Sequence, residues 1–111
     1  MRSLNVTVVG ATGAVGSLFL KLLGNSKLPI ESIRVCASRS SIGEKVEFRD
    51  SVLEVQSLDE LAFRGSNLAF ISVNSTISKE IAPLAIGQGA IVLDDSSASE
   101  WIPKFPLLFQ K

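Results

Sequence analysis

The chain has 111 residues, which favours a single domain, and its 11 basic and 11 acidic residues give a formal net charge of zero. Balanced charge argues against a general nucleic-acid binder, while 46% apolar and 20% charged residues are typical of a globular domain rather than a disordered tail. With no histidine and one cysteine, the sequence excludes a Cys/His zinc site, a Ser-His-Asp triad and an internal disulfide.

The first part of the chain predicts a strand followed by a helix. Residues 6–9 are rich in β-branched side chains and end at Gly10, which predicts a short buried strand. The spacing then becomes helical over residues 14–23, and Gly24-Asn25 is expected to end this helix. Its predicted apolar face consists of Val15, Leu18, Phe19 and Leu22.

Residues 33–37 predict a second strand, and residues 38–43 predict a polar loop. Cys36 lies among apolar neighbours in this strand, and no histidine is available to activate it. We therefore expect a buried structural cysteine rather than a nucleophile. Because the apolar run at the N-terminus is short and interrupted, it is not a signal peptide. No stretch reaches the roughly 18–20 apolar residues of a membrane span, so we expect a cytoplasmic protein with no membrane contact.

The middle of the chain predicts a hairpin and a short helix. Apolar and charged side chains alternate over residues 45–55 around a turn at Asp50-Ser51, which is typical of a small antiparallel hairpin. Ser57 stands three residues before Glu60, the spacing of a capping box, so a short helix is predicted to run to about Phe63.

The last third continues the alternation. Residues 68–73 predict a strand and residues 75–88 a helix that is broken near Pro83, because a proline ring does not fit a regular helix interior. Residues 90–93 predict another strand, and residues 103–109 the start of one more.

Strands that alternate with helices predict an α/β fold: a Rossmann-like, doubly wound, mostly parallel sheet with a small hairpin insertion. A doubly wound sheet of this kind usually has about six strands, and this sequence offers fewer parallel candidates. We therefore expect the sheet to be incomplete at its C-terminal edge. An exposed apolar edge at Leu107-Leu108-Phe109 would pair with another chain, which predicts marginal stability or self-association.

Gly10, Gly13 and Gly16 stand between the first predicted strand and helix, the context in which such a glycine motif is meaningful. Gly10 is expected to make the tight turn, Gly13 to let a pyrophosphate approach the backbone, and Gly16 to let the helix pack closely on the strand. The helix N-terminus favours an anion, and Thr12 adds a hydroxyl donor. The motif predicts dinucleotide binding; a glycine-rich turn without a ligand is the alternative.

The end of the second predicted strand indicates which dinucleotide binds. An acidic residue about 20 residues beyond the motif would bind the ribose 2′-hydroxyl of NAD. The sequence there is Ala37-Ser38-Arg39-Ser40-Ser41, which has no carboxylate. One arginine and three hydroxyls suit a 2′-phosphate, so NADP is the predicted cofactor, with a solvated polar loop as the alternative.

Polar residues also follow the next two predicted strands. Ser72 and Asn74 follow one of them, and Asp95 follows the other. Because the carboxyl ends of parallel strands line one crevice, these residues are predicted to contact ribose, pyrophosphate or nicotinamide. Roles as helix caps and turn residues are the alternative.

Five segments resemble the N-terminal part of aspartate-semialdehyde dehydrogenases. They are Gly10-Ala11-Thr12-Gly13-Ala14-Val15-Gly16, Leu28-Pro29-Ile30, Ala37-Ser38-Arg39-Ser40-Ser41-Ile42-Gly43, Ser78-Lys79-Glu80-Ile81-Ala82-Pro83 and Asp94-Asp95-Ser96-Ser97-Ala98. The resemblance runs nearly end to end and in register. The related N-acetyl-glutamyl-phosphate reductases share the architecture, but their loops are less similar.

This resemblance implies an NADP-dependent reductive dephosphorylation of aspartyl phosphate to the semialdehyde, in the biosynthesis of lysine, threonine and methionine. It also implies a homo-oligomer. The residues that it implies at the pyrophosphate are Thr12, Gly13, Ala14 and Val15. Ser40 and Ser41 would lie near the 2′-phosphate, and Ser72 and Asp95 near the ribose and nicotinamide.

The sequence departs from the family pattern at several positions. Arg39 stands one position earlier than the family's arginine, Val73-Asn74 replaces a usual Ala-Gly, and Asp95 replaces a usual asparagine. Glu100 stands where the family has an arginine that binds the substrate phosphate, and a carboxylate there should repel an acyl phosphate.

The family's cysteine nucleophile and histidine base have no counterpart in these residues, and Cys36 is not at the nucleophile's position. We therefore expect residues 1–111 to form an NADP-binding domain with the catalytic domain absent, which is a fragment without activity of its own. Two alternatives stay open: a non-catalytic nucleotide-binding or dimerisation module, and a folded remnant that binds nothing.

Overall fold

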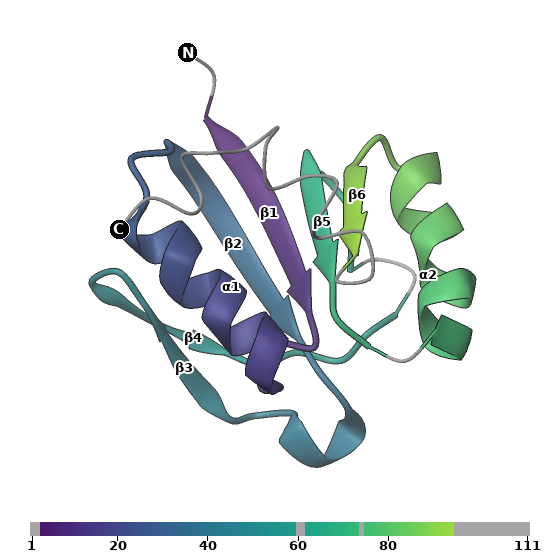
Figure 1. Cartoon of the computed structure of the whole chain (residues 1–111), viewed down its shortest axis with the longest axis horizontal. Coiled ribbons are helices and arrows are strands. Elements are labelled where there is room, and N and C mark those ends of the chain that lie inside the picture. The colour runs from purple at the N-terminus through teal and green to yellow at the C-terminus, as the bar shows by residue number, and fades with distance from the viewer. Residues whose placement is uncertain (1–2, 60–61, 74, 95–111) are drawn as a thin grey trace.

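A four-stranded parallel sheet forms the centre of the described part of the chain (Figure 1). The computed structural model describes residues 3–59, 62–73 and 75–94. The strands lie in the order β2-β1-β5-β6, with bounds Ile30–Cys36 (β2), Leu4–Val9 (β1), Leu68–Ile71 (β5) and Ile91–Asp94 (β6). A separate antiparallel hairpin pairs β3 (Lys45–Phe48) with β4 (Ser51–Glu54). The predicted parallel sheet with a hairpin insertion is confirmed.

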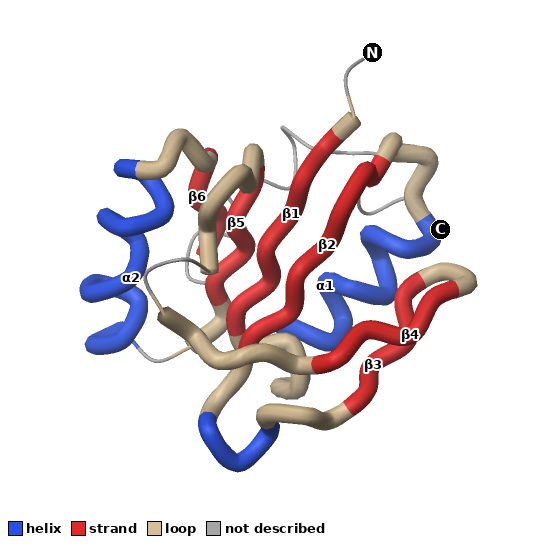
Figure 2. The backbone as a smooth tube through the Cα atoms, turned by 180° about the vertical axis from the view of Figure 1, so that it is seen from behind, coloured by secondary structure: helices blue, strands red, loops and turns tan. Residues whose placement is uncertain are grey.

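The two long helices cover opposite faces of the sheet, as a doubly wound fold requires (Figure 2). Helix α1 (Ala14–Asn25) packs on one face, where the ring of Phe19 stacks on that of Phe70 with centroids 3.9 Å apart. Helix α2 (Ser75–Gly87) packs on the other face through Ile81 and Ala85. Strand β1 is buried on both sides because each face has its own apolar core.

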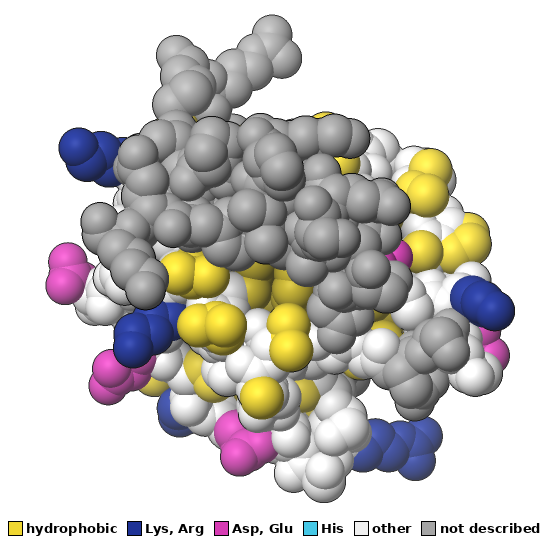
Figure 3. Space-filling model, viewed as in Figure 1, with side chains coloured by type: hydrophobic (Ala, Val, Ile, Leu, Met, Phe, Trp, Pro, Cys, Tyr) yellow, Lys and Arg dark blue, Asp and Glu magenta, His cyan; other side chains and the backbone are white. Residues whose placement is uncertain are grey.

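The apolar face predicted for α1 is rotated from the one that is buried. Val15 and Leu18 are 44% and 54% exposed, and apolar side chains gather at the surface over this helix (Figure 3). The buried residues of α1 are Gly16, Phe19, Leu20 and Leu23. Apolar residues surround most of the helix, so periodicity alone leaves its rotation open. The close approach of Gly16 to the carbonyl oxygen of Gly10 selects the face that turns inward.

The end predicted for α1 is also wrong, because the helix continues through Gly24 and Asn25 to a C-cap at Ser26. The Ser26 hydroxyl donates to the carbonyl of Leu23 at 2.6 Å. The guanidinium of Arg49, from the hairpin turn, donates to the carbonyls of Leu23, Gly24, Ser26 and Leu28 at 3.4, 3.3, 3.2 and 2.8 Å. The local Ser26 and the sequence-distant Arg49 thus complete this helix end together.

The helix predicted to end near Phe63 is not formed in its described residues: 57–59 are irregular and 62–63 belong to a turn. The Ser57 hydroxyl contacts the Asp59 carboxylate at 3.4 Å instead of capping a helix. Ala62 and Phe63 are buried in the core of the α2 face. This burial packs residues 62–63 against the face of the sheet that α2 covers.

The break predicted at Pro83 is wrong, since α2 runs through it. The ring is exposed, while Ile81 and Ala85 on either side are buried against the sheet. A short 3-10 helix, η1 (Arg39–Ser41), lies in the predicted polar loop. The predicted strand over 103–109 and the apolar edge at 107–109 lie outside the described residues. In the described part of the chain, no helix is long and apolar enough to cross a membrane.

Candidate nucleotide-binding site

Three strand ends meet where the strand order of the sheet reverses. The chain runs from β1 outward to β2 and then returns to β5 on the other side of β1, so the switch point lies between β1 and β5. Gly10 follows β1 there, and its N–H donates to the carbonyl of Cys36 at the end of β2 at 2.8 Å. Ser72, just after β5, donates its N–H to the carbonyl of Val9 at 2.9 Å. Open α/β sheets bind their ligands at this position.

The three glycines have different structural requirements. Gly10 has a φ of 84°, and a Cβ built on it would lie 2.1 Å from the carbonyl oxygen of Ser72. A Cβ on Gly16 would lie 2.0 Å from the carbonyl oxygen of Gly10. A Cβ on Gly13 would lie 3.4 Å from that same oxygen, which is an ordinary contact. The fold therefore requires glycine at positions 10 and 16, but it leaves room for a side chain at position 13.

The N-terminal end of α1 is bare. Its N-cap residue, Gly13, makes no side-chain capping bond, and the first turn has no acidic residue. The first N–H groups of any helix lack partners within the helix, and the dipole makes this end attractive to anions. Thr12, Ala14 and Val15 are exposed beside it. The arrangement can bind an anionic group through the backbone.

Hydroxyl groups from two segments of the chain come together beside this end. The Thr12 hydroxyl donates to the Ser41 hydroxyl at 3.2 Å, which joins the glycine loop to η1. Ser38 and Ser40 lie within hydrogen-bond distance of one another at 3.1 Å. Arg39 is exposed and makes no ion pair with another described residue. A cation and several hydroxyls thus lie on the segment that Ser41 joins to the glycine loop.

The other predicted site residues are placed in part. Ser72 is half-buried, and its carbonyl lies directly against Gly10 at the switch point. Asn74 and Asp95 lie outside the described residues, as does Glu100. The structure therefore brings the glycine loop, η1 and the end of β5 to one edge of the sheet.

Cys36 is fully buried, as the sequence predicts. Burial raises the pKa of its thiol to about 11; the positive charge of Arg34 lowers this pKa and the negative charge of Asp59 raises it. The thiol therefore stays protonated near neutral pH, and a protonated thiol is a weak nucleophile. The role of Cys36 at this edge belongs to its carbonyl, which accepts the N–H groups of Gly10 and Ala11 at 2.8 and 3.2 Å.

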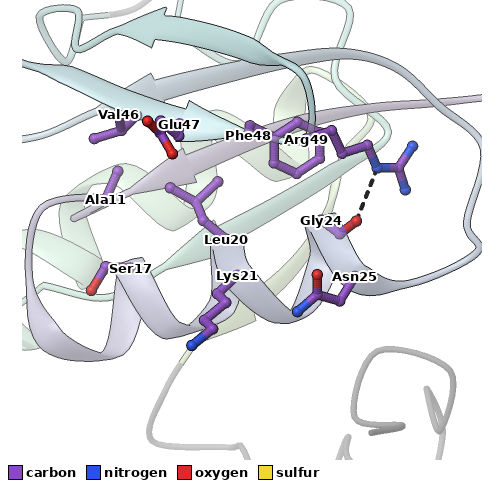
Figure 4. A pocket seen from close by; sticks show the side chains of 10 residues that line it. All are labelled: Ala11, Ser17, Leu20, Lys21, Gly24, Asn25, Val46, Glu47, Phe48 and Arg49. Carbon is purple, nitrogen blue, oxygen red and sulfur yellow. Dashed lines mark hydrogen bonds between the residues drawn. The ribbon is translucent and has the colours of Figure 1, made fainter.

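A groove of about 490 Å³ lies between α1 and the hairpin and extends from Ala11 in the glycine loop to Arg49 in the hairpin turn (Figure 4). Leu20 and Phe48 contribute to its apolar part, and Lys21, Glu47 and Arg49 to its polar part. The sequence prediction missed Arg49, because an arginine beside Asp50 in a hairpin turn has no local signal that distinguishes it from a solvated side chain.

Comparison with known proteins agrees with the site. A family model described as "Semialdehyde dehydrogenase, NAD binding domain" matches residues 5–111. The aspartate-semialdehyde dehydrogenase of Legionella pneumophila is 43% identical over 107 residues, which are 96% of this chain and 31% of that protein. The chain thus spans less than a third of the length of this relative.

Solved structures give the same result. A probable aspartate-semialdehyde dehydrogenase from Pseudomonas aeruginosa matches with a TM-score of 0.79 and 36% identity, over 87% of this chain and 29% of that one. An aspartate-semialdehyde dehydrogenase with NADP from Candida albicans has the same fold, with a TM-score of 0.62 at 21% identity over 89% of this chain and 32% of that one. The resemblance seen in the sequence, including a nicotinamide dinucleotide as the ligand class, is confirmed.

Proposed function

Because this chain belongs to the semialdehyde dehydrogenase family and matches its NAD-binding domain, we propose that it is the dinucleotide-binding domain of an aspartate-semialdehyde dehydrogenase and that its cofactor is NADP. Residues 1–111 then form one such domain. The observation that carries it is Gly13: the fold has room for a side chain there, yet a glycine stands at the bare start of α1. A bound ligand explains why this position stays without a side chain.

The residues at this edge fit the pyrophosphate of a dinucleotide. The backbone of Ala14 and Val15 offers N–H groups at a helix N-terminus, where the dipole favours negative charge. The N–H of Gly13 already donates to the carbonyl of Gly10 at 3.1 Å, so Gly13 contributes its lack of a side chain rather than a donor. Thr12 adds its hydroxyl. Gly10 and Gly16 keep the turn tight enough for these groups to lie together.

The choice of NADP rests on η1 and its neighbours. Residues 37–43 contain no carboxylate to accept a ribose 2′-hydroxyl and none to repel a 2′-phosphate. Arg39 supplies a fixed positive charge, and Ser38, Ser40 and Ser41 supply hydroxyl donors. The NADP named for the Candida albicans structure supports the same choice.

The reaction proposed for the whole protein is the reductive dephosphorylation of aspartyl phosphate, for which a bound nicotinamide supplies the hydride. Ser72, Asn74 and Asp95 follow strands that end at this edge, and we place them near the ribose and nicotinamide. These 111 residues contain no histidine, and the Cys36 thiol is buried and protonated. The proposed role of this chain is therefore to bind and orient the cofactor, within a homo-oligomeric enzyme whose nucleophile and base come from other residues.

Titration of the purified chain with NADPH and with NADH tests the proposal. NADPH should bind more tightly than NADH, and Arg39→Gln should lower the affinity for NADPH about tenfold while that for NADH stays unchanged. Lys27→Gln, which removes an exposed cation beyond the opposite end of α1, is the matched control and should bind as the wild type does.

Three outcomes separate the alternatives. Equal affinities for NADPH and NADH would contradict the choice of NADP and leave a general nicotinamide-binding module. A failure of both cofactors to bind saturably at millimolar concentration would favour a folded remnant. Turnover by the isolated chain with aspartate semialdehyde, phosphate and NADP would contradict the proposed absence of a catalytic nucleophile and base.

A further inference from the structure

One side chain, Arg49, fastens the tip of the hairpin to the C-terminal end of α1 (Figure 4). Its Nε donates to the carbonyl of Gly24 at 3.3 Å, and one terminal nitrogen donates to the carbonyl of Leu28 at 2.8 Å. The guanidinium also lies 5.3 Å from the ring centre of Phe48. The backbone of Arg49 has a φ of 53°, in the left-handed region that favours glycine or asparagine. Its side-chain contacts offset the unfavourable conformation of this arginine.

The base of the same hairpin carries η1. The N–H of Gly43 donates to the carbonyl of Val55, and that of Val55 donates to the carbonyl of Glu44, both at 2.9 Å. The N–H of Glu44 in turn donates to the carbonyl of Ser41, the last residue of η1, at 3.0 Å. The backbone of η1 is thus joined to Glu44, which precedes β3 and pairs with Val55 just after β4.

The same end of η1 also contacts the glycine loop. The hydroxyl of Ser41 accepts a hydrogen bond from Thr12, whereas Ser38, Arg39 and Ser40 are exposed. Exposed side chains do little to fix a loop, so the position of η1 depends on the backbone bonds at the hairpin base. A series of contacts therefore connects the two ends of α1. It runs from the C-terminal end of α1 through Arg49 and the hairpin to η1, which lies beside the N-terminal end of α1.

We propose that Arg49 is a positioning residue for recognition of the cofactor's 2′-phosphate, because it holds the hairpin that places η1 beside the glycine loop. The inference rests on the proposed function, which assigns the 2′-phosphate to η1. Phe48, next to Arg49, is buried in the core of the α1 face. We therefore expect loss of Arg49 to loosen the hairpin tip and η1 without unfolding the sheet.

Four variants of the 111-residue chain test this role. Arg49→Ala removes the anchor, and Arg49→Gly removes the anchor together with the unfavourable φ. Arg49→Lys keeps a charge that can reach one carbonyl and should rescue part of the effect. Lys45→Ala is the control: it removes another hairpin cation, which pairs with Glu54 at 2.7 Å where both side chains are well exposed.

The first measurement is backbone amide exchange in the chain without cofactor. In Arg49→Ala and Arg49→Gly, exchange at residues 41–44 should speed up about tenfold, while exchange in β1 and β5 stays unchanged. Lys45→Ala should match the wild type. Unchanged exchange at residues 41–44 in Arg49→Ala would overturn the inference. Wild-type exchange in Arg49→Gly would also overturn it, because the faster exchange in Arg49→Ala would then come from backbone strain at position 49 and not from loss of the anchor.

The second measurement is the affinity for NADPH and for NADH. Arg49→Ala should lower the affinity for NADPH about fivefold and that for NADH less than about twofold, so that the preference for NADPH falls. A variant that loses both affinities equally would contradict a positioning role. If the wild-type chain shows no preference for NADPH, both the proposed choice of NADP and this inference are contradicted. If the wild type prefers NADPH and Arg49→Ala retains that preference, this inference alone is contradicted.

Discussion

The two ends of α1 differ in how their backbone groups are satisfied. At the C-terminal end, Ser26 and Arg49 donate to the last carbonyls. At the N-terminal end no side chain caps Gly13, and the neighbouring residues are exposed. Every helix has unpaired groups at both ends. The C-terminal end, whose carbonyls accept hydrogen bonds from the protein's own side chains, stabilises the fold. The N-terminal end, which no side chain caps and which follows the glycine loop, is available for an anionic ligand.

The largest expected effect comes from a methyl group added at the bare end. Gly16→Ala places a Cβ 2.0 Å from the carbonyl oxygen of Gly10, which the tight turn cannot accommodate without moving. We expect the free energy of unfolding to fall by about 3 kcal/mol. Urea unfolding followed by circular dichroism measures this change. An unchanged midpoint would show that the turn is looser than the contact between Gly10 and Gly16 implies.

A smaller effect is expected from loss of the cap at the opposite end. Arg49→Ala leaves the carbonyls of Gly24 and Leu28 to water and should lower the free energy of unfolding by about 1 kcal/mol, since these contacts are largely exposed. The same unfolding experiment measures it. A destabilisation as large as that of Gly16→Ala would mean that Arg49 stabilises the core as well as the end of the helix.

The smallest effect has the opposite sign. Gly24→Ala adds a Cβ inside α1 at 3.7 Å from the ring of Phe48, an ordinary contact, and replaces glycine in a helix. We expect the variant to be more stable by about 0.5 kcal/mol, measured as a rise in the thermal midpoint. Gly16 and Gly24 lie in the same helix and differ only in how closely other atoms surround them. Destabilisation by Gly24→Ala would therefore contradict the conclusion that only Gly16 lacks room for a side chain.

Local sequence patterns predicted the parts of the fold that depend on local chemistry. The buried β1, the hairpin and the glycine turn all follow from composition and spacing over a few residues. The rotation of α1 and its extension past Gly24 depend on contacts with Gly10 and Arg49, which periodicity within the helix does not contain. The described residues 57–59 and 62–63 do not form the helix predicted from Ser57, and Phe63 is buried in the core instead.

The sequence predicts the glycine turn of the candidate site, but it does not predict which distant segments come together there. The strand–glycine–helix pattern locates the turn, and the absence of a carboxylate near Arg39 is the sequence basis for proposing NADP. The contact between Thr12 and Ser41 joins residues 29 positions apart, so only the paired strands β1 and β2 reveal it. The contribution of Arg49 has the same origin, because its partners lie at the far end of another element.

The most direct test of the cofactor site is the effect of Gly13→Ala on NADPH binding and on folding, measured together. We predict an affinity loss of about tenfold or more with a free energy of unfolding within about 0.5 kcal/mol of the wild type, because the fold has room for this methyl group and a bound pyrophosphate does not. Gly24→Ala, which adds the same group at the satisfied end of α1, should retain the wild-type affinity. Wild-type affinity in Gly13→Ala would contradict the assignment of the bare helix end as the cofactor site.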